Sequence, residues 1–266
     1  MAADPGRPVD PAESAPVARP ELDLSVYLVT DGALCADLGV VETVRRSVAA
    51  GASVMQVRDP QASDAEVVDL TRACVEVCLD LYRYGATSRL VPVIVNDRPD
   101  LAVEASAAGA HVGQADLDVA TARRVLGPDR YLGLSVHTHA ELAAAIAATT
   151  DSIGMNRTGR TTTRRTTDAA QSDLDYLGIG PLRATLSKSD HAPARGQPHL
   201  SSLAAASPWP CVVIGGVVAS DAAPLRAAGL AGMAVISAIC GQPDVAAATR
   251  LLVQAWRTAT AGGLAS

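Results

Sequence analysis

The sequence has 266 residues, of which 48% are hydrophobic, and its formal net charge at pH 7 is −6. A chain of this length and composition can bury one large core, which predicts one catalytic domain of the size of an α/β barrel. The acidic balance argues against a nucleic-acid partner, because such a protein needs lysine and arginine gathered on a basic face.

The N-terminal segment has five prolines before Glu21 and no apolar stretch long enough for a signal-peptide core. We therefore expect residues 1–22 to be a disordered tail and residues 23–260 to form the barrel domain. The longest apolar run, residues 230–239, is about half of the ~20 residues that a membrane helix needs, so we expect no membrane span. The five cysteines are odd in number and lack CxxC spacing, which indicates buried reduced thiols and a cytoplasmic location.

From residue 24 onward, short valine- and isoleucine-rich runs alternate with longer stretches of helical pattern, several of which open on a capping Ser, Thr or Asp. Eight strands that alternate with helices through right-handed crossovers predict a (β/α)8 TIM barrel. A doubly wound sheet is the alternative, but it needs a GxGxxG turn after the first strand, which Asp31-Gly32-Ala33 does not provide. The predicted strands are 25–30, 53–58, 92–96, 110–113, 131–136, 175–180, 211–216 and 232–237, and predicted helices include 64–82, 120–126, 140–148 and 221–228.

Polar residues and glycines stand where the predicted strands end. In a barrel these positions all fall on the C-terminal face, where barrel enzymes build their sites from βα loops. The glycine-rich turn after the seventh strand matches the usual phosphate site, in which backbone N–H groups hold the anion. The strand-end residues are Gln56, Arg58, Asn96, Asp97, Gln114, Asp116, Ser135, Gly215, Gly216, Ile236 and Ser237.

Asp97 and Asp116 each follow an apolar run on neighbouring predicted strands, so we expect both carboxylates to face one pocket. Such a pair suits a hard divalent cation, which prefers carboxylate oxygens. Each acid could instead cap the helix that follows it, because aspartate is a favoured N-cap residue. The two acids together favour the metal interpretation.

In chain order these motifs resemble those of the thiamine-phosphate synthases. That family shows QxRxK, NDR, HxGQxD, a serine, GPxxxTxTK, IGG and a V/I-S pair after strands two to eight. Here the segments read QVRDP, NDR, HVGQAD, LSVH, GPLRATLSK, IGG and IS, in register across roughly residues 24–258. The resemblance implies transfer of 4-amino-2-methyl-5-(diphosphooxymethyl)pyrimidine to thiazole phosphate, which gives thiamine phosphate and pyrophosphate.

The resemblance also implies Mg²⁺ held by Asp97 and Asp116 against the departing diphosphate. In that family the C–O bond ionises before the thiazole nitrogen captures the pyrimidine cation, so catalysis is mainly electrostatic and positional. Arg58, Ser135 and Lys188 are then the expected catalytic residues. The resemblance assigns the pyrimidine substrate to Gln56, Arg58, Asn96, Ser135 and Lys188, and the thiazole phosphate to Thr185, Ser187, Gly216, Ile236 and Ser237.

Each assignment has a plainer structural alternative. Arg58 could pair with Asp59 at the surface, and Lys188 could be a solvated loop lysine. The glycines could only permit a tight turn, Ser237 could cap the next helix, and the other polar residues could bond the backbone. His137 and His139 are interpreted as residues of a helix start and not as metal ligands.

Three departures separate this chain from the family pattern. Pro60 stands where the family has lysine, so one cationic contact is missing and diphosphate binding should be weaker. Ser187 replaces the second threonine of TxTK and keeps the hydroxyl. Residues 149–173 form an Arg- and Thr-rich insertion before the sixth strand, which we expect on the N-terminal face of the barrel, away from the chemistry.

Two other functions compete with the synthase. A thiazole-phosphate tautomerase of the same barrel type would need the phosphate site but neither metal carboxylate, so Asp97, Asp116 and Lys188 argue against it while Pro60 argues mildly for it. A catalytically inactive barrel that binds thiazole phosphate or a partner would keep Gly216 and Ser237 without turnover.

Overall fold

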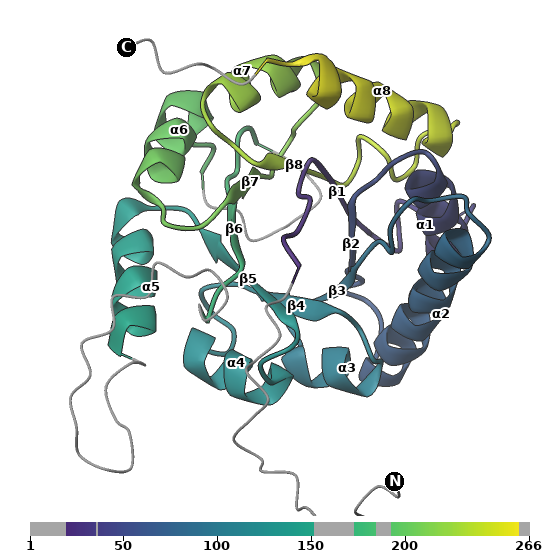
Figure 1. Ribbon diagram of the computed structural model, residues 1–266, viewed down its shortest axis with the longest axis horizontal. Coiled ribbons are helices and arrows are strands. Elements are labelled where there is room, and N and C mark those ends of the chain that lie inside the picture. Colours follow the sequence, from purple (N-terminus) through teal and green to yellow (C-terminus); the bar gives the residue numbers. More distant parts are fainter. Residues whose placement is uncertain (1–19, 36, 152–172, 185–192, 261–266) are drawn as a thin grey trace, which may run out of the picture.

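The computed structural model describes residues 20–35, 37–151, 173–184 and 193–260. Eight parallel strands close into a barrel in chain order, with β1 paired to β2 on one side and to β8 on the other (Figure 1). The predicted barrel is therefore confirmed, and the doubly wound alternative is wrong because an open sheet leaves its edge strands unpaired. The strands are β1 Val26–Val29, β2 Val54–Val57, β3 Val93–Asn96, β4 Gly109–Val112, β5 Tyr131–Val136, β6 Tyr176–Ile179, β7 Cys211–Val213 and β8 Gly232–Val235.

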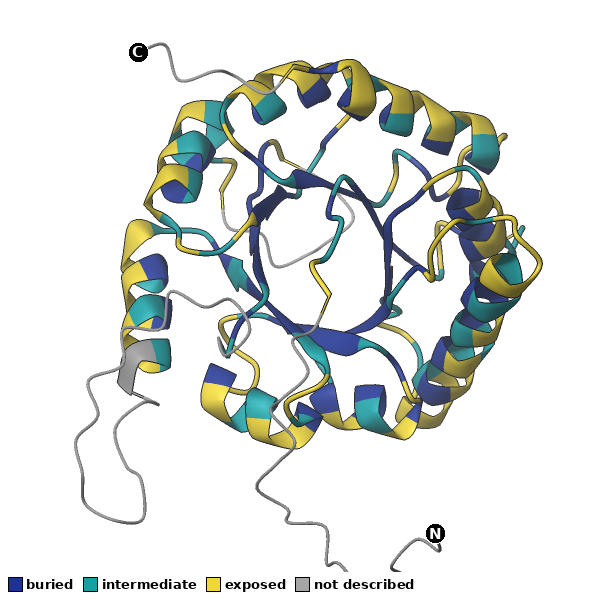
Figure 2. Ribbon diagram, viewed as in Figure 1, coloured by how far each residue is buried: buried dark blue, intermediate teal, exposed yellow. Residues whose placement is uncertain are grey.

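Helices form a ring outside the barrel, with buried faces toward the strands and exposed faces toward solvent (Figure 2). On α2 the buried residues Val68, Thr71, Cys74, Val77 and Cys78 recur at the three- and four-residue spacing of one helix face. Cys74 and Cys78 therefore belong to the core between the barrel and the helices. The helices in the described residues are α1 Val40–Ala49, α2 Asp64–Arg83, α3 Pro99–Glu104, α4 Val119–Leu126, α5 His139–Asp151, α6 Gly196–Ala206, α7 Ala222–Ala227 and α8 Val245–Thr258, with a 3-10 turn η2 Ala219–Asp221.

The strands are buried on both faces, which explains their nearly continuous apolar sequences. Within β1, Val26 and Leu28 join the large core between barrel and helices, whereas Tyr27 and Val29 point into the barrel. The interior cluster is small and contains two tyrosines, Tyr27 and Tyr176. A barrel of this kind is a packed core, so space for a ligand arises only at its mouth.

The described residues test only some of the predictions about the tail, the insertion, the cysteines and membrane spans. Most of the predicted tail, residues 1–19, lies outside the described residues. The predicted insertion 149–173 begins inside α5, and its residues 152–172 also lie outside the described part. All five cysteines are buried free thiols, as expected. No helix among the described residues is both long and apolar enough to cross a membrane.

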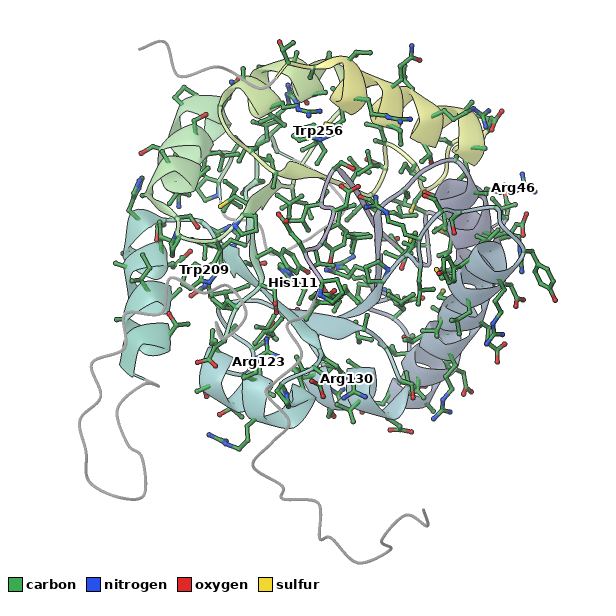
Figure 3. The ribbon with its side chains drawn as sticks, in the orientation of Figure 1. Arg46, His111, Arg123, Arg130, Trp209 and Trp256 are labelled. Atoms are coloured by element: carbon green, nitrogen blue, oxygen red, sulfur yellow. The ribbon has the colours of Figure 1, made fainter. Side chains whose placement is uncertain are left out.

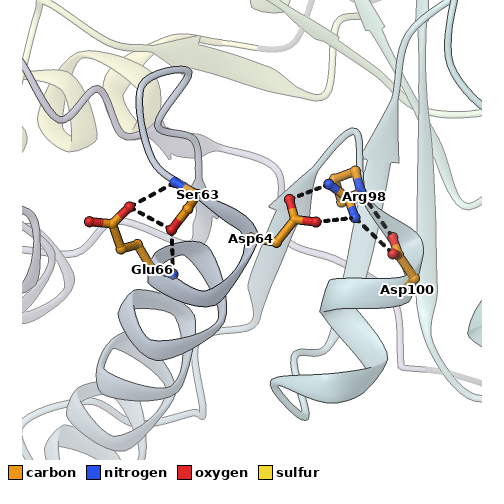
Figure 4. A network of polar contacts seen from close by, with 5 residues as sticks. All are labelled: Ser63, Asp64, Glu66, Arg98 and Asp100. Carbon is orange, nitrogen blue, oxygen red and sulfur yellow. Dashed lines mark hydrogen bonds and ion pairs between the residues drawn. The ribbon is translucent and has the colours of Figure 1, made fainter.

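A capping box starts α2 on the C-terminal side of β2. The backbone N–H of Ser63 donates to Glu66 Oε2 at 2.8 Å, and the Ser63 hydroxyl accepts from the Glu66 N–H at 3.4 Å (Figure 4). Next to it, Arg98 binds both Asp64 and Asp100, which ties the start of α2 to the start of α3. These contacts hold the loops after β2 and β3 in place.

We expect Ser63→Ala to lower the free energy of unfolding by about 1 kcal/mol, because the first turn of α2 loses the acceptor for a backbone N–H. Urea denaturation followed by circular dichroism measures the change. The control is Ser88→Ala, which alters an exposed serine in the loop after α2. Equal destabilisation by the two substitutions would contradict the capping role.

Candidate active site

A cavity of about 120 Å³ lies at the mouth of the barrel, at the C-terminal ends of the strands. Its volume exceeds the share of a single water several-fold, so it can admit part of a small organic ligand. Tyr27, Gly178 and Val212 belong to its wall inside the barrel, and loops after the strands form the rim. The sequence-predicted residues that line it are Gln56, Arg58, Asn96, Ser135, Gly216, Ile236 and Ser237.

The loop after β6 carries three further predicted residues. Thr185, Ser187 and Lys188 fall in residues 185–192, outside the described part of the chain. The described residues on either side approach each other, since the Arg195 N–H donates to Pro181 O at 3.0 Å. Pro181 lines the cavity, so this contact lies at the cavity rim.

Asp97 and Asp116 follow β3 and β4, which are adjacent in the barrel. The Asp97 N–H donates to His111 O at 2.7 Å, and Asp97 Oδ2 accepts from the Asn96 amide at 2.5 Å. Asp116 is exposed, and its Oδ2 accepts from the Gly113 N–H at 2.6 Å. Neither acid is part of the cavity lining itself.

Neither acid caps a helix. The N-cap of α3 is Arg98, and the N-cap of α4 is Asp118, whose carboxylate accepts from the Thr121 N–H at 2.9 Å. The capping interpretation of Asp97 and Asp116 is therefore wrong. Asp97 also has φ of 60°, a conformation that costs free energy in a residue other than glycine and that tends to occur at functional sites.

Arg58 is held by a carboxylate that was not predicted from the sequence, that of Asp31. Its Nη1 lies 3.3 Å from Asp31 Oδ2, and the two side chains are only 13% and 12% exposed. Thr30 fixes the backbone of Arg58, because its Oγ1 accepts from the Arg58 N–H at 2.9 Å and donates to Arg58 O at 3.1 Å. The alternative of a surface pair with Asp59 is wrong, because the partner is the largely buried Asp31. The missed signal was that the run SVYLVTD also ends in an acid at a strand tip.

Five polar side chains form a continuous hydrogen-bonded row inside the barrel. Gln56 Nε2 donates to Tyr27 OH at 2.8 Å, and the hydroxyls of Tyr27 and Tyr176 are 2.8 Å apart. The Tyr176 hydroxyl lies 3.1 Å from His111 Nδ1, and His111 Nε2 lies 3.0 Å from Ser135 Oγ. Figure 3 shows His111 within the barrel.

No role was predicted from the sequence for Tyr27, Tyr176 or His111. The sequence feature that could have identified these three residues is a polar side chain within an otherwise apolar strand. Burial raises the pKa of the Tyr27 phenol and that of the Tyr176 phenol well above their ordinary value, so both keep their protons at neutral pH.

Gly215 and Gly216 form the turn after β7 with φ of 94° and 66°, values that favour glycine. A Cβ on Gly215 would lie 2.4 Å from Pro181 Cβ, so close packing also requires glycine there. The tight-turn interpretation is thus confirmed, and both glycines line the cavity as well. Ser237 does not cap α8, whose N-cap is Asp244.

Arg183 fastens this turn to the loop after β6. Its N–H donates to Gly215 O at 3.0 Å, and its Nη1 donates to Gly216 O at 2.9 Å. The same guanidinium binds both oxygens of Asp221, and Asp221 Oδ2 accepts from the Val218 N–H at 2.9 Å. The ion pair holds the glycine turn at the cavity rim.

His137 lines the cavity, and its Nδ1 lies 2.7 Å from Gly180 O, so it donates to that carbonyl. The predicted helix start is confirmed, because α5 begins at His139 and Glu141 Oε2 accepts from the His137 N–H at 2.5 Å. His137 therefore serves to place the start of α5 beside the cavity.

The family model described as thiamine monophosphate synthase matches residues 26–171 and 159–239. The thiamine-phosphate synthase of Psychrobacter sp. (strain PRwf-1) is 40% identical over 230 residues, 86% of this chain and 94% of that protein. That of Azorhizobium caulinodans is 38% identical over 86% of this chain and 93% of the relative.

Solved structures agree with these matches. The thiamine phosphate pyrophosphorylase from Pyrococcus furiosus superposes with a TM-score of 0.67 at 26% identity and covers 88% of this chain and 96% of its own. A 3-hexulose-6-phosphate synthase, with a TM-score of 0.56 at 14% identity over 86% of this chain and 99% of its own, shares the fold.

The pair of Arg183 and Asp221 predicts a pH dependence. Burial alone would raise the pKa of Asp221, but the bonds from Arg183 and Val218 outweigh it and hold that pKa below its ordinary value. A depressed folded-state pKa stabilises the fold above the unfolded value of about 3.9, and this stabilisation is lost as the pH falls through the folded-state pKa.

We expect Asp221→Asn to lower the free energy of unfolding at pH 7 by up to about 1 kcal/mol, since Arg183 is half exposed and solvent weakens the pair. The difference from wild type should shrink below about pH 4, as urea titrations at several pH values would reveal. Asp69→Asn, on the exposed face of α2, is the control. A difference that stays constant down to pH 3 would refute the ion-pair account.

Proposed function

This chain belongs to the thiamine monophosphate synthase family, and on that premise we propose how the residues around its cavity carry out the reaction. The chain is a transferase that joins 4-amino-2-methyl-5-(diphosphooxymethyl)pyrimidine to thiazole phosphate and releases pyrophosphate. One observation carries the placement of the substrates: predicted residues from the ends of β2, β3, β5, β7 and β8 line a single cavity.

The pyrimidine substrate is proposed to lie against Gln56, Asn96 and Ser135. All three line the cavity and come from different strands, so they can contact a planar ring from separate directions. Part of the inner wall beside them is apolar and consists of Val29, Val212 and Ala234. An apolar wall suits a reaction that forms a pyrimidine cation, because water in contact with that cation would trap it as the alcohol.

The thiazole phosphate is proposed to bind at the opposite rim, on the turn of Gly215 and Gly216 together with Ile236 and Ser237. The turn brings backbone close to the cavity, and Arg183 keeps it in that conformation. Thr185 and Ser187, from the loop after β6, complete this site in the proposal.

Arg58 and Lys188 are proposed to neutralise the diphosphate as the C–O bond breaks. The guanidinium of Arg58 has five N–H donors, of which the bond to Asp31 uses one, and the side chain faces the cavity. Its tether to Asp31 and to Thr30 gives it a fixed position before substrate arrives, which is how electrostatic stabilisation is most effective.

Asp97 and Asp116 are proposed to hold Mg²⁺. Their donor set fits, because Mg²⁺ is usually bound by one or two carboxylates with the remaining ligands supplied by substrate phosphates and water. When bound, the cation supplies positive charge to the diphosphate as it departs. The positive φ of Asp97 belongs to a tight three-residue turn, in which the Arg98 N–H donates to Asn96 O at 2.8 Å, and strained turns of this kind occur preferentially at functional sites.

The tautomerase and the inactive barrel are not favoured. The relatives that cover 86% of this chain are thiamine-phosphate synthases, and both metal carboxylates and Arg58 are present. We further propose a cytoplasmic location, which the five reduced cysteines support.

Pyrophosphate release from the two substrates tests the proposal. We expect Asp97→Asn and Asp116→Asn each to lower kcat/KM by at least ~100-fold, because removing one charge from the cation's ligand set weakens the stabilisation of the leaving group. A chelator should stop the wild-type reaction, and added Mg²⁺ should restore it. Asp69→Asn serves as the matched control, and full activity of Asp97→Asn would disprove the metal role.

Restoring the lysine of the family pattern should improve binding. We expect Pro60→Lys to lower KM for the pyrimidine diphosphate about 3- to 10-fold, since a charge-assisted hydrogen bond to a diphosphate oxygen becomes available. Steady-state kinetics with saturating thiazole phosphate measures this change. Pro60→Gln removes the proline without adding charge, so an equal gain in that variant would show that backbone freedom, not charge, is responsible.

A further inference from the structure

The polar row inside the barrel connects two residues proposed to bind the pyrimidine. Gln56 on β2 stands at one end and Ser135 on β5 at the other, with Tyr27, Tyr176 and His111 between them. Four of these five side chains line the cavity, and Tyr176 is fully buried beneath it. A buried row of this kind is strongest when every donor meets an acceptor.

The number of protons in the row allows only one assignment of donor and acceptor to each of its hydrogen bonds. The amide nitrogen of Gln56 can only donate, so the Tyr27 oxygen accepts from it. Among the described residues the Tyr27 hydroxyl has Gln56 and Tyr176 as its hydrogen-bond partners, so its single proton goes to Tyr176. The Tyr176 proton then goes to His111 Nδ1, and the remaining ring proton on Nε2 goes to Ser135 Oγ.

Packing keeps the row in register. The ring centroids of His111 and Tyr176 are 5.4 Å apart, and those of Tyr27 and Tyr176 are 5.8 Å apart. A Cβ on Gly133 would lie 2.4 Å from His111 Nδ1, and one on Gly178 would lie 2.9 Å from His111 Cε1. The absence of a side chain at Gly133 on β5 and at Gly178 on β6 thus leaves room for the imidazole of His111. The close packing around the ring restricts its rotation.

We propose that Tyr27, Tyr176 and His111 are positioning residues that set the direction of these hydrogen bonds, so that His111 is the neutral Nε2–H tautomer and Ser135 presents its hydroxyl hydrogen to the ligand. The Gln56 amide oxygen is the group left to face the cavity. The row therefore offers a ligand an acceptor at Gln56 and a donor at Ser135.

This pattern selects for a ligand that carries both a donor and an acceptor. An aminopyrimidine has an exocyclic N–H₂ that donates and ring nitrogens that accept, whereas an oxopyrimidine reverses the exocyclic group. The specificity for an aminopyrimidine rests on the proposed function, but the tautomer of His111 does not. Separate experiments can therefore refute the specificity and the tautomer independently.

The tautomer is measured by nitrogen NMR on wild-type protein labelled at histidine with ¹⁵N, at pH 7. We expect the resonances of His111 to show an unprotonated Nδ1 and a protonated Nε2, with assignment from the signal that changes in Tyr176→Phe. That variant removes the donor to Nδ1, so a shift toward the Nδ1–H tautomer is expected. A protonated Nδ1 in wild type, or an imidazolium, would overturn the proposal whether or not the enzyme is active.

Kinetics tests the consequence for the substrate. Tyr176→Phe is expected to lower kcat/KM for the pyrimidine diphosphate about 10- to 100-fold, while KM for thiazole phosphate stays within about twofold. Tyr131→Phe is the matched control, because its hydroxyl bonds Pro20 O away from the cavity. If Tyr176→Phe fails to fold, Tyr27→Phe interrupts the same row one step earlier.

Unchanged kcat/KM in a folded Tyr176→Phe or Tyr27→Phe variant would refute the positioning role. Wild-type protein that releases no pyrophosphate would refute the proposed function instead, and the NMR result would still decide the tautomer.

Discussion

Closure of the barrel is the constraint on which every other feature depends. Because β1 pairs with both β2 and β8, all eight strands run parallel and end on one face. Residues far apart in the sequence then meet: Asp31 and Arg58 across β1 and β2, and Asn96 and His111 across β3 and β4. The positions of these side chains are thus set by the pairing register of the strands.

The cations described around the cavity are held by acids before any substrate binds. Asp31 holds Arg58, and Asp221 holds Arg183. Each tether fixes a positive group where the substrates are proposed to carry phosphate, and so removes part of the cost of ordering it during the reaction. The polar row beneath the cavity adds directionality to this charge pattern, since it decides which groups donate and which accept.

The sequence allowed the barrel to be predicted because strands buried on both faces leave continuous apolar runs. The predicted ranges exceed the observed ones by one to three residues for six of the eight strands, most clearly for β7, where the positive φ of Gly215 and Gly216 ends the extended conformation. Because these runs are nearly continuous, they do not reveal which residues point into the barrel, and no role was predicted for Tyr27 or Tyr176. The partner of Arg58 was missed because Asp59 is adjacent in sequence, whereas Asp31 becomes a neighbour only through strand pairing.

The central claim is that acids from adjacent strands and Arg58 act on one departing diphosphate. A crystal structure with Mn²⁺ and pyrophosphate, with anomalous data collected at the manganese edge, tests it most directly. The account predicts one anomalous peak within bonding distance of Asp97 and Asp116, with pyrophosphate oxygens reaching both the metal and Arg58. A metal bound elsewhere, or pyrophosphate bound without either aspartate near the metal, would contradict it.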